Sequence, residues 1–372
     1  MEKRYATEGI LSPKQAHSLV SKLIYSVEGI TNCYLDTVTQ EVVVGLTVES
    51  DRVSLDKTVS LMMQKEKNHR VLSNRVYIEN LTGQTSSNPL FEVDTVYEND
   101  GSVRRDIAVL LIDHLDALFV KHTGHAHPEL RSYPSLIPLN SLEKCSYIPY
   151  FPQNIHLVSE FPHQMEALER VKETSDLQGN ARLSPYALSP AVCFHCYEEL
   201  SGRRLSEPVL LTARGLCFRH EAAWRLGKHR LNEFSMREVV IFGSGEYVES
   251  IRMKLMNDVW NLFVDLGLTG KIETASDPFY FSEDAAKSQH QLMANTKYEL
   301  VVALGDENFS IASFNHVGDS LCKPFDVCDS GNKPLNSGCV AFGIDRWAYA
   351  LLKTYGTDLE LWPGRIRTML SV

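Results

Sequence analysis

The sequence lacks long apolar runs. No stretch of about 18 apolar residues, the length that a bilayer-spanning helix needs, occurs among the 372 residues. The first residues lead into no apolar segment of the signal-peptide type, so we expect a cytoplasmic protein. With 44% hydrophobic and 23% charged residues, the composition is globular, which excludes collagen-like, low-complexity and disordered classes. The length suits one large domain and a smaller one.

Basic residues are not in excess either. The 37 Lys and Arg are outnumbered by 47 Asp and Glu, and the formal net charge is −10. Binding to a phosphate backbone requires clustered basic side chains. The overall balance therefore disfavours a nucleic-acid partner, although it is compatible with a local basic groove.

Common nucleotide-binding signatures are also missing. Residues 267–272 contain a Gly-Lys pair but no hydroxyl residue after the lysine, and residues 243–245 lack the third glycine of a dinucleotide site. The histidines of residues 122–127 could hold a metal, although a solvated helix end and turn is the more common structure for such a run. Without an export signal, we expect most of the eight cysteines to be buried thiols.

Hydrophobic periodicity predicts a small ferredoxin-like α/β domain over residues 1–80. The pattern has the order β-α-β-β-α-β, because helical spacing alternates with β-branched runs. The segments concerned are a helix at 14–24, strands at 30–35 and 41–46, a helix at 53–63 and a closing strand at 75–78. The charges of this unit nearly cancel, which argues against a tRNA-binding arm. We predict that residues 81–101, which contain many turn-forming and polar residues, are a linker.

Residues 102–372 contain many short strand patterns and few long helices. We predict an α+β fold, a mostly antiparallel sheet flanked by helices. Apolar spacing predicts helices from Ile107 to Leu118, from Glu246 to Val264 and from Asp345 to Leu352. The predicted strands are residues 209–214, 238–242, 271–274, 298–304 and 309–314.

Two distant segments have the composition of an ATP-binding site. In the first, Arg219 and Glu221 end a strand, and Arg230 and Phe234 lie where the chain returns. An arginine fork can hold the α-phosphate, a glutamate can accept from the adenine amino group, and phenylalanine can stack on the purine. In the second, a strand of small residues runs into a helix whose Arg346 can meet the γ-phosphate. One Arg-x-Glu alone is usually a surface ion pair, whereas the two segments together predict ATP binding.

These segments resemble motifs 2 and 3 of class II aminoacyl-tRNA synthetases. Met236-Arg237-Glu238 and Asn336-Ser337-Gly338-Cys339 are similar to one branch of that class. The branch contains the zinc-dependent atypical seryl-tRNA synthetases and their shortened bacterial relatives, the amino acid:[carrier protein] ligases. The resemblance covers roughly residues 100–372 and leaves residues 1–80 unassigned. Further similar segments are 142–147 with 151–153, 275–279, and 297–300 with 313–315.

The resemblance implies a zinc site formed by Cys193, Glu238 and Cys339. Three protein ligands leave one tetrahedral position open, which the α-amine of an amino acid can fill. Two alternatives stay open at this point. Cys196 could replace Cys193, or a closed structural zinc site could be formed by four cysteines, namely Cys193, Cys196, Cys322 and Cys328.

The resemblance also implies further contacts to ATP and substrate. Glu299 and Asn315 are candidates for the acidic and polar edge of the site, where Mg²⁺ bridging the phosphates needs oxygen ligands. Glu299 is expected at the ATP site. Lys297 and Asn315 are expected to bind the amino acid. Glu299 and Asn315 are equally typical of buried polar residues satisfied by their neighbours. Residues 282–294 could guide a pantetheine arm or form a solvated helix.

The implied reaction has two steps. A small amino acid, of glycine or alanine type, and ATP give an aminoacyl-adenylate and pyrophosphate, with Arg219 and Arg346 as the catalytic residues at the phosphates. The phosphopantetheine thiol of a carrier protein then accepts the acyl group. The resemblance also implies a homodimer with the helix at 103–121 near its interface.

Two other functions are considered. A seryl-type tRNA synthetase would share every site residue above, but the charge-balanced N-terminal unit and the acidic whole make tRNA an unlikely partner. A catalytically inactive regulatory paralogue would be expected to lose part of the site, whereas all of its residues are intact in the sequence.

Overall fold

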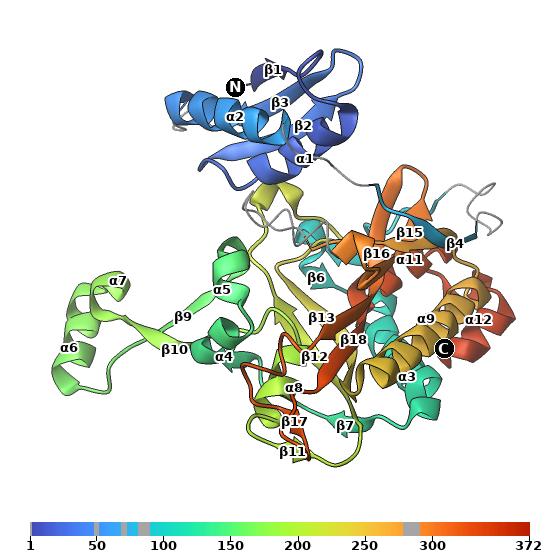
Figure 1. The fold of residues 1–372 in the computed structure, drawn as a ribbon. Coiled ribbons are helices and arrows are strands. Elements are labelled where there is room, and N and C mark those ends of the chain that lie inside the picture. Colours follow the sequence, from blue (N-terminus) through green and yellow to red (C-terminus); the bar gives the residue numbers. More distant parts are fainter. Residues whose placement is uncertain (1, 48–51, 68–72, 81–89, 278–290) are drawn as a thin grey trace.

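A small N-terminal unit lies beside a large α+β unit in the computed structural model, which describes residues 2–47, 52–67, 73–80, 90–277 and 291–372 (Figure 1). The small unit has a three-stranded sheet in the order β1-β3-β2. Its core contains valines of β3, Leu19 and Leu23 of α1, and Leu55 of α2. Its elements are β1 (Glu2–Ala6), α1 (Pro13–Leu23), β2 (Ile30–Asp36), β3 (Glu41–Leu46) and α2 (Arg52–Lys67).

The strand predicted to close this small sheet lies elsewhere. β4 (Val76–Asn80) pairs antiparallel with β14 (Gly270–Thr274) at the edge of the large sheet. The prediction that residues 75–78 complete a ferredoxin-like sheet is therefore wrong. A periodic pattern identifies a strand and its two faces, but it does not identify the strand with which it pairs.

The predicted linker is correspondingly shorter than expected. Residues 81–89 lie outside the described residues, whereas Val93, Val96 and Tyr97 are buried in the core of the large unit. The prediction of a linker is wrong for these three residues, because apolar side chains among polar neighbours anchor the segment.

The large unit is built on an eight-stranded sheet in the order β4-β14-β15-β16-β18-β13-β12-β7. Every pairing is antiparallel except that of β12 with β7, which is parallel. The predicted mostly antiparallel sheet flanked by helices is thus confirmed. The strands not yet bounded are β15 (Lys297–Leu304), β16 (Glu307–Gly318), β18 (Asn336–Gly343), β13 (Glu233–Gly243), β12 (Val209–Phe218) and β7 (Glu129–Arg131).

One face of this sheet packs against the main core, and the other faces α8 and the predicted metal ligands. Val239, Ile241, Val340 and Phe342 point into the main core, which the helices of that side cover. Because side chains alternate along a strand, Glu238 and Cys339 face the opposite side, toward α8 (Cys193–Glu199). The main-core helices are α3 (Ile107–Thr123), α9 (Gly245–Asp265), α11 (Ile344–Tyr355) and α12 (Gly364–Leu370), and the first three confirm predicted helices.

A protruding segment and several short pairs complete the described fold. Figure 1 shows α6 and α7 at the end of a long excursion between β9 and β10. None of the helices in the described ranges has both the length and the apolarity that a bilayer span requires. The remaining elements are β5 (Tyr97–Glu98), β6 (Val103–Arg104), β8 (Leu136–Pro138), α4 (Leu139–Lys144), α5 (Tyr147–Tyr150), β9 (Leu157–Glu160), α6 (Met165–Thr174), α7 (Leu177–Asn180), β10 (Arg182–Leu188), β11 (Arg204–Leu205) and β17 (Cys328–Asp329).

A nearly buried ion pair joins α3 to the sheet. Arg237 donates from Nε and Nη2 to the two carboxylate oxygens of Asp116, both at 2.7 Å. The variant Asp116→Ala would leave this guanidinium uncompensated, so we expect it to lower the free energy of unfolding by about 3 kcal/mol. Urea unfolding measures this loss. The control Asp265→Ala breaks the exposed pair with Arg365 and should change stability by less than about 0.5 kcal/mol; equal losses would contradict the prediction.

Candidate functional site

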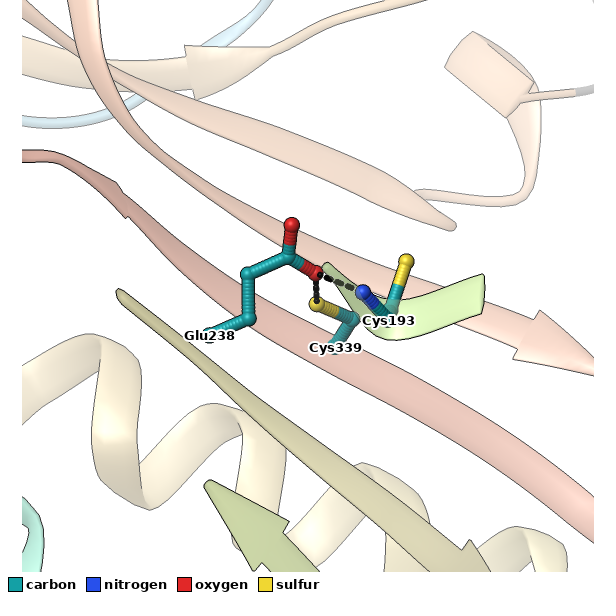
Figure 2. A group of neighbouring side chains, drawn as sticks. All are labelled: Cys193, Glu238 and Cys339. Atoms are coloured by element: carbon teal, nitrogen blue, oxygen red, sulfur yellow. Dashed lines mark hydrogen bonds between the residues drawn. The ribbon is translucent and has the colours of Figure 1, made fainter. Parts of the chain in front are cut away.

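Two cysteines and a glutamate meet between α8 and the sheet. The ligand atoms of Cys193, Glu238 and Cys339 all lie within 4.8 Å of one another. Cys339 Sγ donates to Glu238 Oε2 at 3.1 Å, and the backbone N–H of Cys193 donates to the same oxygen at 3.1 Å, as Figure 2 shows. The strand register explains this meeting, because Glu238 pairs with Ala341, two residues beyond Cys339 on the same face.

The chemistry of this group fits a zinc ion. Contact with Cys193, burial and the Glu238 carboxylate together raise the pKa of the Cys339 thiol well above its ordinary value. A buried cluster of groups that are anionic when they bind metal is costly unless a cation is present to offset the charge. Two thiolates and a carboxylate suit zinc and leave one tetrahedral position open.

The structure also decides between the alternatives for the metal group. Cys193, and not Cys196, contributes to it. Within the described residues, which include all eight cysteines, no other group of three His, Cys, Asp or Glu side chains has such short separations. The four-cysteine site with Cys322 and Cys328 is therefore wrong. The histidine-rich segment forms no metal group among the described residues either, and His125 instead pairs with Asp258 at 3.0 Å.

Three arginines converge on the same pocket from different elements. Arg219 follows β12, Arg230 precedes β13, and Arg346 lies in the first turn of α11. Arg346 is fixed through its Nε to His229 O and through its Nη1 to Ser310 O, both at 2.8 Å. Burial, together with repulsion from Arg230 and Arg219, lowers the pKa of the Arg346 guanidinium to about 10. The three guanidinium groups line one pocket, and a bound polyphosphate would offset their positive charge.

The Glu221 carboxylate contacts two arginines of the pocket wall, Arg230 and Arg225. Its Oε1 accepts from Arg230 Nη1 at 3.1 Å, and its Oε2 lies 3.8 Å from Arg225 Nη1. Tyr25 of the N-terminal unit donates to Oε2 at 3.5 Å. Phe234 also lines the pocket, with the Arg219 guanidinium 5.2 Å from its ring centre. The predicted pair of an adenine acceptor and a stacking ring is thus in one place.

A second charged cluster lies on β15 and β16. Lys297 pairs with Asp277 and, at 3.3 Å, with Glu299 Oε1. Burial opposes the charge of Lys297, but Asp277 and Glu299 outweigh it and raise the pKa of the ammonium group. Asn315 lies opposite Lys297 in the strand register and donates to Ser313 Oγ at 3.2 Å. The cluster offers two carboxylates, an ammonium and an amide to a bound molecule.

One pocket of about 1610 Å³ joins these groups. All the residues predicted for the metal, ATP and substrate sites line it. Sequence reasoning assigned no role to Asp277, although it lies in the similar segment 275–279, and gave no signal for Tyr25. Residues 278–290, which include most of the stretch proposed to guide a pantetheine arm, lie outside the described residues.

Comparisons with known proteins agree with this geometry. No protein-family model matches the chain. Amino acid--[acyl-carrier-protein] ligases 1 and 2 of Bradyrhizobium diazoefficiens are 32% and 31% identical over 270 residues, covering 70% and 69% of this chain and 82% and 78% of those proteins. The Type-2 serine--tRNA ligase of Methanococcus aeolicus is 28% identical over 258 residues, which are 64% of this chain and 49% of that protein.

Solved structures confirm the class II synthetase-like fold. M. kandleri SerRS in complex with A. aeolicus tRNASec matches with a TM-score of 0.71 at 19% identity, covering 100% of this chain and 77% of that one. Seryl-tRNA synthetase from Pyrococcus horikoshii complexed with ATP matches with a TM-score of 0.54 at 13% identity, covering 72% and 57%. At these identities, the likeness concerns the fold alone.

Proposed function

We propose that this chain, which belongs to the amino acid--[acyl-carrier-protein] ligase family, uses ATP to activate a small amino acid and passes it to the phosphopantetheine thiol of a carrier protein. The observation that carries the proposal is the single pocket, which has the Cys193, Glu238 and Cys339 group and the three converging arginines in its wall. One molecule bound there could therefore have its amine at the first group while its carboxylate meets a nucleotide at the second.

In the first step, a carboxylate oxygen of the amino acid attacks the α-phosphorus of ATP. The bond from that phosphorus to the bridging oxygen breaks, and pyrophosphate leaves. Arg219 holds the α-phosphate and Arg346 the γ-phosphate, so that charge is stabilised where it develops. Arg346 suits this role because its guanidinium donates to the backbone carbonyls of His229 and Ser310, which fix it before ATP binds. In-line attack needs positioning more than covalent chemistry from the protein.

The adenine base and the Mg²⁺ that accompanies ATP would have separate partners. Phe234 stacks on the adenine ring, and Glu221 accepts from its amino group, while Arg230 contributes charge beside both. Glu299 offers an oxygen ligand to the Mg²⁺ that accompanies ATP. Lys297 and Asn315 contact the amino acid from β15 and β16.

Zinc would be held by Cys193, Glu238 and Cys339. When bound, it supplies a Lewis-acid position for the α-amine of the substrate and so selects compounds with a free amine. The amino acid would have a small side chain, of glycine or alanine type, as the sequence resemblance implies. In the second step, the carrier thiol attacks the acyl carbon and its proton passes to solvent. The bond from that carbon to the phosphate oxygen breaks, so AMP leaves as the thioester forms.

The exposed apolar residues near α3 support a homodimer. Val109 and Leu110 on α3 and Leu130 on β7 are between 48% and 63% exposed, although large apolar side chains are usually covered. We propose that a second copy covers this surface. A cytoplasmic location stays a prediction.

A seryl-type tRNA synthetase is the second candidate, because Type-2 serine--tRNA ligases match the same part of the chain at 28% identity. The acidic net charge and the longer, more identical match to the carrier-protein ligases disfavour it. An inactive paralogue is disfavoured because the whole predicted site lines one pocket.

The activity is tested by amino-acid-dependent exchange of pyrophosphate into ATP. We expect exchange with one or two small amino acids, and loss of exchange when a chelator removes zinc. Labelled amino acid should then appear on a phosphopantetheinylated carrier protein, whereas the same carrier without phosphopantetheine is the matched control. Labelled tRNA in place of labelled carrier would contradict the proposal and favour the synthetase.

A further inference from the structure

We infer that the N-terminal unit helps to select the nucleotide base, with Tyr25 as a positioning residue for Glu221. The inference rests on the proposed function, in which Glu221 accepts from the adenine amino group. The sequence resemblance gives the N-terminal unit no role, and the matches to the carrier-protein ligases cover only 70% and 69% of the chain. The contacts of this unit with the pocket point to a role in nucleotide binding.

The N-terminal unit forms part of the pocket wall. Ser21 and Lys22 on α1, with Ile24 and Tyr25 just after that helix, line the same cavity as the three arginines. Lys22 forms an ion pair with the buried Glu66 of α2, which holds the end of α1 in place. Figure 1 shows α1 and β2 on the side of the small unit that faces the large one. A molecule in this pocket could therefore meet residues of both units.

The loop that carries Glu221 is anchored in the small unit. Trp224, three residues later, packs against the small unit's own hydrophobic core. The short 3-10 helix at Ala223–Arg225 lies against β2. Glu221 itself is fixed through its backbone N–H, which donates to Asn232 Oδ1 at 2.9 Å. Tyr25 and Glu221 are thus held toward each other by packing on both sides.

Tyr25 matters because the Glu221 carboxylate has few sites at which it can accept a hydrogen bond. An ionised carboxylate offers about four lone-pair sites. Arg230 occupies one on Oε1, while Tyr25 and the more distant Arg225 approach Oε2. About one site is then left for a donor on the base. Arg230 binds Oε1 and the Tyr25 hydroxyl binds Oε2, so the two contacts together fix the orientation of the carboxylate. This orientation sets the direction of the lone pair that is left for the base.

The free site distinguishes two purines. Adenine presents an amino group, a donor, at position 6, whereas guanine presents a carbonyl oxygen, which the carboxylate would repel. Loss of the Tyr25 hydroxyl would let Glu221 turn toward Arg230 and Arg225. Affinity for ATP and the preference for ATP over GTP should then fall together.

The test is Tyr25→Phe in the full-length protein, which removes only the hydroxyl. We expect the KM for ATP in pyrophosphate exchange to rise about tenfold, the effect of one hydrogen bond to a charged group. The kcat should stay nearly constant, since the base contact is the same in ground and transition states. The ratio of kcat/KM for ATP to that for GTP should also fall. Tyr34→Phe, a variant of a tyrosine on β2 of the same unit, is the matched control and should change none of these.

Each other outcome overturns the inference. An unchanged KM for ATP in Tyr25→Phe, with normal exchange by the wild type, would overturn it and leave the proposed function intact. A fall in kcat at constant KM would indicate a merely structural role. Calorimetric titration with ATP gives a readout that does not depend on catalysis. A wild-type protein that binds no ATP would overturn both the inference and the proposed function.

Discussion

Cys339→Ser should abolish zinc binding and amino acid activation together. The variant exchanges a buried thiol in the metal group for a hydroxyl, a poor ligand for zinc. We expect metal content to fall from about one zinc ion per chain to near zero. Exchange activity should fall by at least about 100-fold, because even changes to the partners of metal ligands cost 10–100-fold. Elemental analysis and pyrophosphate exchange on one preparation measure both quantities.

The matched control for this variant is Cys322→Ser. Cys322 is buried in the same hydrophobic cluster as Cys339 but belongs to no metal group among the described residues. Any loss caused simply by placing a hydroxyl in this cluster should therefore appear in both variants. Full zinc content with full exchange in Cys339→Ser would refute the assignment of the metal site. Equal losses of zinc in the two variants would also count against it.

Arg219→Ala should reduce exchange by about 100- to 1000-fold, the cost of removing a preorganised donor from developing charge. The guanidinium is held in place, since its Nε donates to Pro190 O at 3.2 Å and its central carbon lies 5.2 Å from the centre of the Phe234 ring. Arg219→Lys keeps the charge but loses the planar fork, so it should recover only part of the activity. Initial rates at saturating ATP and amino acid measure the effect.

Arg204→Ala is the control for the arginine variants. Arg204 pairs with Asp326 at a partly exposed position and does not line the pocket. Its loss should leave exchange within a factor of about two, as expected for an exposed ion pair. Arg219→Ala at more than a third of the wild-type rate, with zinc retained, would argue against a role for this residue at the phosphates.

The local elements of the large unit could be predicted because their sequence patterns are strong. Apolar spacing identified α3, α9 and α11, and alternation identified the strands that carry Glu238 and Asn315. The predicted strand at 209–214 is too short, since β12 runs from Val209 to Phe218. Glu238 lies near Cys339, and Lys297 near Asn315, because adjacent strands in register bring their side chains to one face.

Contacts between distant segments could not be predicted in the same way. The sequence of β4 correctly predicts a strand but not its partner. Strands pair through backbone N–H and C=O groups, and the alternation of side chains does not specify which strand supplies them. The contact of Tyr25 with Glu221 joins residues 196 positions apart and depends on how Trp224 packs. The contact between the two units depends on the shapes of their folded surfaces. Neither unit has a sequence motif that predicts this contact.

The position of β4 has a consequence for how the two units can be separated. β14 is paired with β15 on one side and with β4 on the other. A shortened protein that began after β4 would leave the outer N–H and C=O groups of β14 open, and open strand edges attract other chains. One that began between α2 and β4 would keep this edge protected. The natural dividing line therefore lies before the strand, because β4 pairs with β14 of the large sheet and not with the small sheet.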